Sequence, residues 1–78
     1  MLLEIITPDK RIFEDEINSV VLPGIDGFFG ILKDHAPMIS ALKKGVVKIT
    51  DKNSALHVFE IEGGVVEVLK NRIIVLAE

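Results

Sequence analysis

Two short apolar runs meet at a glycine-rich turn in the stretch Leu22-Pro23-Gly24-Ile25-Asp26-Gly27-Phe28-Phe29-Gly30-Ile31-Leu32. Pro23-Gly24 suits the centre of a type II turn, and Asp26-Gly27 suits a tight turn with a positive φ at the glycine. A phosphate-binding loop would need a helix after the glycines and usually a Lys-Ser/Thr pair. A β-rich segment follows instead, so this stretch predicts turns that join strands.

Similar apolar runs, separated by turn residues, extend over the whole chain. We count about nine of them, at residues 2–6, 11–13, 17–22, 28–32, 37–42, 45–50, 55–61, 64–69 and 72–76. Val and Ile supply 9 + 11 = 20 of the 78 residues, and β-branched side chains favour pleated sheets over helices. No segment has the apolar spacing of an amphipathic helix over three turns. The sequence therefore predicts one all-β domain over residues 1–78, a sandwich or barrel of short strands.

Composition and charge argue against several classes of function. The net charge is −3, whereas binding to nucleic acid needs a clustered basic surface. Cysteine is absent and the two histidines are far apart in the sequence, so we expect neither a zinc site nor a cysteine nucleophile. No apolar run reaches the roughly 18 residues of a membrane span, and the N-terminus lacks a basic signal region. We therefore expect a cytosol-facing chain without direct membrane insertion.

Few residues are candidates for a site. Successive side chains of a strand point to opposite faces, so at most one ring of Phe28 and Phe29 enters the core, and the other can contact a partner. The sequence does not decide which ring is exposed. His35 has no serine or cysteine nucleophile beside it, so we interpret it as a loop histidine that hydrogen-bonds the backbone. His57 is interpreted as a residue on a strand face.

Lys52 supports an alternative function. It follows Asp51 in a predicted polar turn. Lipoyl and biotinyl carrier domains are flattened β structures of similar length that present a modified lysine on such a turn, and the lipoyl type often has aspartate before it. An ordinary exposed turn explains the same residues. A carrier domain with Lys52 as the modified residue therefore remains the alternative.

The order of motifs along the chain resembles the ε subunit of F-type ATP synthases. The matching segments are Leu22-Pro23-Gly24, Gly27, Gly30-Ile31-Leu32, His35-Ala36-Pro37, Leu42, Gly63-Gly64, Glu67-Val68 and the ending from Asn71 to Glu78. The chain departs from this pattern at Phe28, where the family often has an acid, and at Glu62, where it often has serine. It is also shorter, because typical members continue into two C-terminal helices.

The resemblance implies a flattened β-sandwich of about ten short strands. It further implies a non-catalytic subunit of the rotor that packs on the γ subunit and contacts the c-ring, coupling proton flow to ATP synthesis at the cytoplasmic face of the bacterial inner membrane. The γ contacts would be His35, Ala36, Pro37, Met38, Ile39 and Leu42, and the c-ring contacts would be Asp26, Gly27 and Phe28. No cofactor or metal is implied. Nucleotide binding is not expected, because the family binds nucleotide in its helices.

Overall fold

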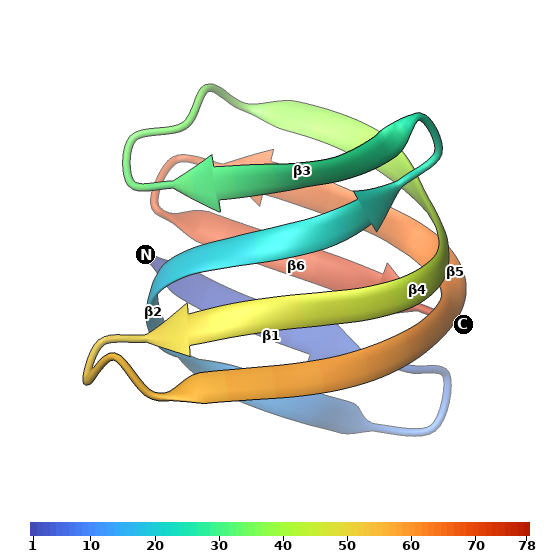
Figure 1. Cartoon of the computed structure of the whole chain (residues 1–78), viewed down its shortest axis with the longest axis horizontal. Helices are drawn as coiled ribbons and strands as arrows, with labels where there is room; N and C mark the ends of the chain where they lie inside the picture. Colours follow the sequence, from blue (N-terminus) through green and yellow to red (C-terminus); the bar gives the residue numbers. More distant parts are fainter.

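The computed structural model describes residues 1–78, which form six β-strands and no helix. The strands are β1 (Leu2–Ile6), β2 (Arg11–Gly24), β3 (Gly27–Leu32), β4 (Met38–Asp51), β5 (Leu56–Leu69) and β6 (Arg72–Ala77). The prediction of an all-β chain is confirmed. Strands β2, β4 and β5 are each 14 residues long, and β4 and β5 curve together around one side of the molecule (Figure 1).

Five of the strands form a closed sheet. Their order is β1-β6-β5-β4-β2, and β2 pairs back onto β1. Neighbouring strands are antiparallel except for β1 and β6, which are parallel. β3 is joined to β2 as a hairpin and has no strand on its other side, so it is an edge strand. The molecule measures 27 × 24 × 18 Å.

The prediction of about ten short strands is wrong, because three pairs of apolar runs are single long strands. Runs 11–13 and 17–22 belong to β2, runs 37–42 and 45–50 to β4, and runs 55–61 and 64–69 to β5. In β5 the break was predicted at Glu62 and Gly63, but the strand continues through Gly63 and Gly64, with φ of 150° and 148°. A Cβ at Gly64 would lie 2.2 Å from the carbonyl oxygen of Leu76. Glycine therefore lets a continuous strand bend closely against β6.

The interior of the closed sheet is filled by aliphatic side chains. Fifteen buried hydrophobic residues form one core cluster, mainly Val, Ile and Leu. Alternation along a strand decides which side chains enter it. Val66 and Val68 of β5 are buried, whereas Val65 between Gly64 and Val66 is 40% exposed. In this part of β5 one face therefore enters the core, and apolar side chains remain on the other.

Glu4 is an almost fully buried carboxylate in the apolar strand β1. Its oxygens form ion pairs with Arg11 of β2, at 3.1 Å from Nε, and with Arg72 of β6. A buried carboxylate is tolerated only when it is paired and hydrogen-bonded. The two arginines thus connect β1 to both of its neighbours. The sequence analysis did not predict this cluster, although an acid inside an apolar run is its signal.

Candidate partner-binding surfaces

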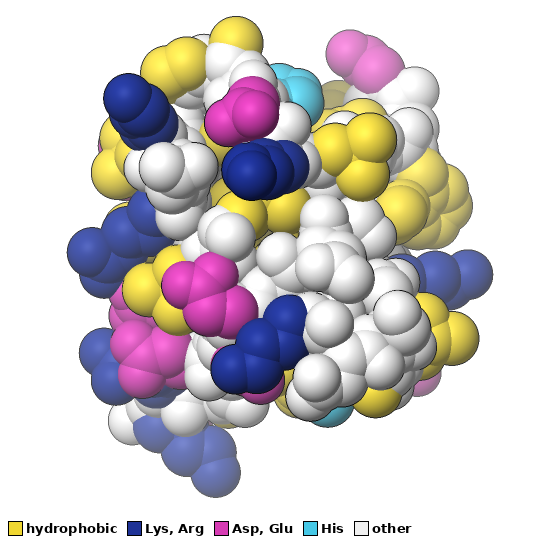
Figure 2. All heavy atoms as spheres, turned by 90° about the vertical axis from the view of Figure 1, so that its left-hand side faces the viewer, with side chains coloured by type: hydrophobic (Ala, Val, Ile, Leu, Met, Phe, Trp, Pro, Cys, Tyr) yellow, Lys and Arg dark blue, Asp and Glu magenta, His cyan; other side chains and the backbone are white.

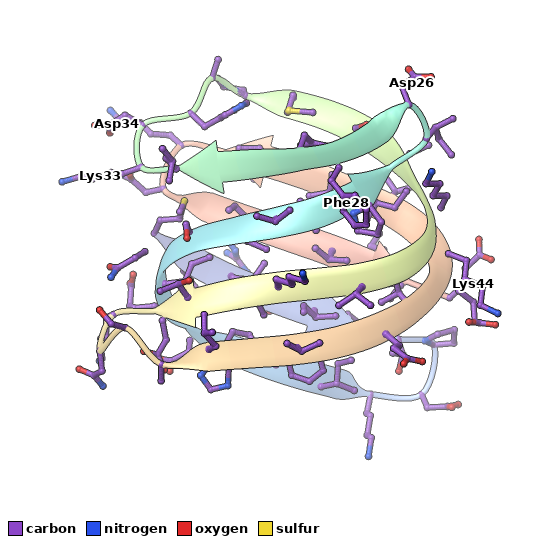
Figure 3. The ribbon with its side chains drawn as sticks, viewed as in Figure 1. Asp26, Phe28, Lys33, Asp34 and Lys44 are labelled. Atoms are coloured by element: carbon purple, nitrogen blue, oxygen red, sulfur yellow. The ribbon has the colours of Figure 1, made fainter.

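The turn between β2 and β3 holds the residues expected to contact a c-ring. Ile25 and Asp26 form a two-residue turn closed by Gly24 and Gly27, and Figure 3 shows Asp26 at its tip. A Cβ at Gly24 would lie 2.7 Å from Cε1 of Phe29. This close approach requires glycine, because the aromatic ring lies directly over the backbone of the turn.

The two phenylalanines that follow this turn point to opposite faces of β3. Phe28 is 64% exposed, whereas Phe29 is partly buried and packs against the core. The structure therefore decides what the sequence left open: Phe28 is the exposed ring (Figure 3). With Ile25, which is 56% exposed, it gives this end of the molecule an apolar surface beside one carboxylate.

The loop from Lys33 to Pro37 lies at the opposite end of β3 from this turn (Figure 3). His35 is half-buried there, and its Nδ1 lies 2.7 Å from the Ala36 carbonyl oxygen. Its own backbone N–H donates to the carbonyl of Leu32 at 3.2 Å. This geometry agrees with the interpretation of His35 as a loop histidine that hydrogen-bonds the backbone.

The other expected γ contacts lie at the end of this loop and in β4, and they differ in exposure. Ala36 and Pro37 are exposed, and Ile39 is 71% exposed. Met38 is half-buried and packs against the core. Leu42 is 4% exposed and belongs to the core. The side chain of Leu42 is therefore not available to a partner, and Ile39 is the exposed large apolar residue among the expected γ contacts.

A hollow of about 510 Å³ connects the two sets of residues. It is lined by the β2–β3 turn with Phe28 and Phe29 on one side, and by Ile39, Ser40 and Ala41 of β4 on the other. The structure thus brings together residues 11 to 13 positions apart that the family resemblance assigned to two different partners. Ser40 and Ala41 were missed, because only their place in the fold puts them beside Phe28.

A second exposed apolar surface lies on β4, β5 and β6. Ala41 is paired with Val65, and Val65 is paired with Leu76, so their side chains share one outer face. Val65 and Leu76 are 40% and 54% exposed. Ile39 lies on the same face of β4, two residues before Ala41. The apolar surface therefore continues from Ile39 across three strands.

The end of the molecule that carries the loops is mixed in charge. Figure 2 shows acidic and basic side chains next to one another there, with apolar side chains between them and at the rim. The structure has no group of three or more His, Cys, Asp or Glu side chains that could hold a metal ion. It also has no helix of the length and hydrophobicity needed to cross a membrane.

The turn that carries Lys52 is organised by the preceding residue. The Asp51 carboxylate accepts hydrogen bonds from the N–H groups of Asn53 and Ala55, at 2.8 and 3.0 Å, and its second oxygen lies 2.8 Å from Nε2 of His57. These bonds lower the pKa of Asp51, the bond to His57 most of all. Asp51 before Lys52 therefore has a structural role in closing the hairpin, which removes the main argument for a carrier lysine.

Sequence comparisons give the same relationship over the whole chain. A family model described as ATP synthase, Delta/Epsilon chain, beta-sandwich domain matches residues 1–78. The ATP synthase epsilon chain of Chlorobium limicola is 46% identical over 76 residues, which cover 97% of this chain and 86% of the relative. That of Campylobacter curvus is 42% identical over 76 residues, which cover 59% of the relative. The carrier-domain alternative finds no support among these relatives.

Solved structures show the same fold. A chain in the mitochondrial ATP synthase of Euglena gracilis, in a structure of OSCP, F1 and the c-ring, has a TM-score of 0.92 at 18% identity, with 99% of this chain and 49% of that chain covered. A chain in the central stalk and c-ring of the Tetrahymena thermophila enzyme has a TM-score of 0.82 at 19% identity, with 99% and 62% covered. The family match, the close relatives and the fold agree, and the chain belongs to the family of ATP synthase delta/epsilon chain β-sandwich domains.

Proposed function

We propose that this chain is a non-catalytic subunit of the central stalk of a proton-translocating ATP synthase. Membership of the epsilon chain family supports this proposal. The observation that carries it is the pair of exposed apolar residues, Phe28 and Ile39, on the two sides of one hollow. Specific interfaces use such apolar anchors inside a polar rim. Neither side chain contributes to the core, so both are available to a partner.

We assign the two surfaces to two partners. The γ subunit would pack on the loop at His35 to Pro37 and on the exposed face that begins at Ile39. The c-ring would meet the turn at Asp26, Gly27 and Phe28, through an apolar contact. The chain would then lie at the cytoplasmic face of the bacterial inner membrane as a peripheral part of the complex, and would transmit rotation between the c-ring and γ.

The experiment is a binding titration of this chain against the γ subunit, with Ile39→Asp as the test variant. Truncating or charging an anchor residue commonly costs about 2 kcal/mol or more, which is roughly thirtyfold in affinity. Leu56→Asp is the matched control, because Leu56 is 75% exposed at the other end of the β4–β5 hairpin. Equal affinity of the wild type and Ile39→Asp, with both folded, would contradict the assignment of this surface to γ.

A further inference from the structure

Strand β3 is an edge strand without the usual protection against pairing. It is hydrogen-bonded to β2 along Gly27–Leu32 and to no strand on its other side. The six residues are GFFGIL, with no charge, no proline and no break in register. Natural proteins protect exposed edges with lysine, proline or bulges. An apolar and unprotected edge of this kind is therefore available for pairing with another strand.

The free edge presents backbone groups of alternate residues. Gly24 and Gly27 close the two-residue turn and form a hydrogen-bonded pair. Hydrogen-bonded and non-bonded pairs alternate along an antiparallel ladder, so Phe29 and Ile31 also direct their backbone groups towards β2. The N–H and C=O groups of Phe28, Gly30 and Leu32 therefore point away from β2. The Leu32 carbonyl already accepts a hydrogen bond from His35. The N–H of Leu32 and both groups of Phe28 and Gly30 remain available to another strand.

We propose that β3 pairs with β3 of a second copy of this chain, antiparallel and centred on Gly30, to form a two-fold symmetric dimer. The positions 28, 30 and 32 are symmetric about Gly30. In this register the two Gly30 residues exchange both of their hydrogen bonds. The N–H of each Leu32 meets the carbonyl of Phe28 in the other copy. The carbonyl of Leu32, which already accepts from His35, would accept a second hydrogen bond from the N–H of Phe28 in the other copy, because a carbonyl oxygen has two lone pairs.

Side chains and charge favour the same register. Phe28 and Leu32 are 64% and 66% exposed on one face, and each would cover the other across the new pair. Asp26 precedes the strand and Lys33 follows it, at opposite ends of β3 (Figure 3). Antiparallel pairing puts Lys33 of one copy opposite Gly27 of the other copy. Lys33 then lies close to Asp26 of that other copy, and the two opposite charges attract. Asp34 has a φ of 65° and turns away from the strand.

A hollow lies at the turn end of β3, between Phe28 and Phe29 on β3 and Ile39 on β4. β4 therefore does not pack directly against this end of β3. A contact made by one short strand is small, and interfaces below about 1,200 Å² in total are weak and transient. We therefore expect a dissociation constant in the range of roughly 10 to 500 μM.

The test is sedimentation equilibrium of the 78-residue chain between 20 μM and 1 mM. The wild type should show a reversible monomer–dimer equilibrium. Phe28→Glu, which restores a charge to the edge, should weaken it by roughly thirtyfold. Val58→Glu is the control: Val58 is 60% exposed on β5, away from the edge, and the dissociation constant should not change. A single monomeric species at 1 mM, or equal weakening by both variants, would overturn the proposal.

A cysteine at the symmetry axis tests the register. The chain has no native cysteine, and a Cβ at Gly30 meets no atom closer than 3.9 Å. Gly30→Cys should therefore fold and be joined to its second copy by a short bis-maleimide, whereas Lys44→Cys, which lies at the bend of β4 and not on β3 (Figure 3), should not. Cross-linking of both variants to the same extent would rule out the pairing at Gly30.

Pairing of two copies through β3 goes beyond the proposed function. Only the effect of this pairing on assembly with the c-ring rests on the proposed function. Phe28 would be covered in the dimer, so the dimer could not use this residue for the c-ring. The test uses the chain alone, and its failure leaves the proposed function untouched. Hydrogen exchange at the Gly30 and Leu32 amides gives a further check. If these amides are protected only when a different protein is added, then β3 pairs with a strand of that protein and not with a second copy of this chain.

Discussion

Nε2 of His57 lies 2.8 Å from the carboxylate of Asp51, across the hairpin that joins β4 and β5. The other oxygen of Asp51 holds the turn through two backbone N–H groups, and the His57 ring packs edge-on against Phe13 of β2, with ring centroids 5.4 Å apart. One aspartate thus connects the turn to the aromatic cluster that covers this side of the core.

The first prediction concerns the pH dependence that Asp51 contributes. Its pKa is lowered in the folded chain, first by the hydrogen bond to His57 and then by that to Ala55. The contribution to stability is therefore present above the unfolded pKa of about 3.9 and is lost as the pH falls through the lowered folded value. Asp51→Asn should be less stable than the wild type at pH 7 in urea unfolding, and the difference should shrink towards pH 2.

Asp9→Asn is the control for this series, because Asp9 is an exposed acid in the β1–β2 turn. It should change neither the stability at pH 7 nor its pH dependence. A difference between Asp51→Asn and the wild type that stays constant from pH 7 to pH 2 would show that the charge of Asp51 is not the cause.

The second prediction concerns the cluster of Glu4, Arg11 and Arg72. Each arginine can still pair with the buried carboxylate when the other is removed. Arg11→Ala and Arg72→Ala should therefore each cost about 1 kcal/mol, whereas the double variant should cost about 3 kcal/mol or more, because it leaves a buried carboxylate unpaired. A double-mutant cycle in urea measures this. Additive losses would mean that the two ion pairs act independently.

The third prediction compares the effects on stability of alanine at two glycines, Gly64 and Gly30, which differ in how close their neighbouring atoms lie. Gly64→Ala would put Cβ 2.2 Å from a backbone oxygen at a φ of 148°. It should destabilise the chain by more than about 3 kcal/mol or prevent folding. Gly30→Ala has no neighbour closer than 3.9 Å and should change the free energy of unfolding by less than about 1 kcal/mol. Similar melting temperatures of the two variants would contradict the close packing of β5 on β6.

The fourth prediction compares the adjacent aromatic residues. Phe29→Ala removes a ring that packs against the core and covers Gly24, so it should cost about 2–4 kcal/mol. Phe28→Ala removes an exposed ring and should cost less than about 0.5 kcal/mol, while weakening coupled ATP synthesis in the assembled complex. Thermal unfolding of both variants gives the comparison. A larger loss for Phe28→Ala than for Phe29→Ala would reverse the assignment of the two rings.

The fifth prediction concerns nucleotide. The glycines of the β2–β3 turn lead into a strand, so there is no helix N-terminus to hold a phosphate. Calorimetric titration with ATP should therefore give no saturable binding up to 1 mM. A submillimolar dissociation constant would contradict this prediction and would call for a site that does not use a phosphate loop.

The sequence by itself determined the all-β class of the fold. Val and Ile favour pleated strands for local steric reasons, and alternation decides that Val66 is inside when Val65 is outside. A turn beside Asp26-Gly27 and the turn after Asp51 were also predicted, because turn chemistry depends on neighbouring residues. The turn predicted at Pro23-Gly24 is wrong, because both residues belong to β2. The family relationship followed from motif order alone, since that order is a property of the sequence.

Only the tertiary structure decided how the runs join and which residues meet. Gly63 and Gly64 are equally suited to a turn and to a bend within a strand, and the choice depends on the close passage of β6 at Leu76. The exposure of Phe28 rather than Phe29 depends on which face of β3 lies over the core. The pairing of Glu4 with Arg72, 68 residues away, likewise follows from closing the sheet, because long-range contacts are set by the packing of strands and not by local sequence.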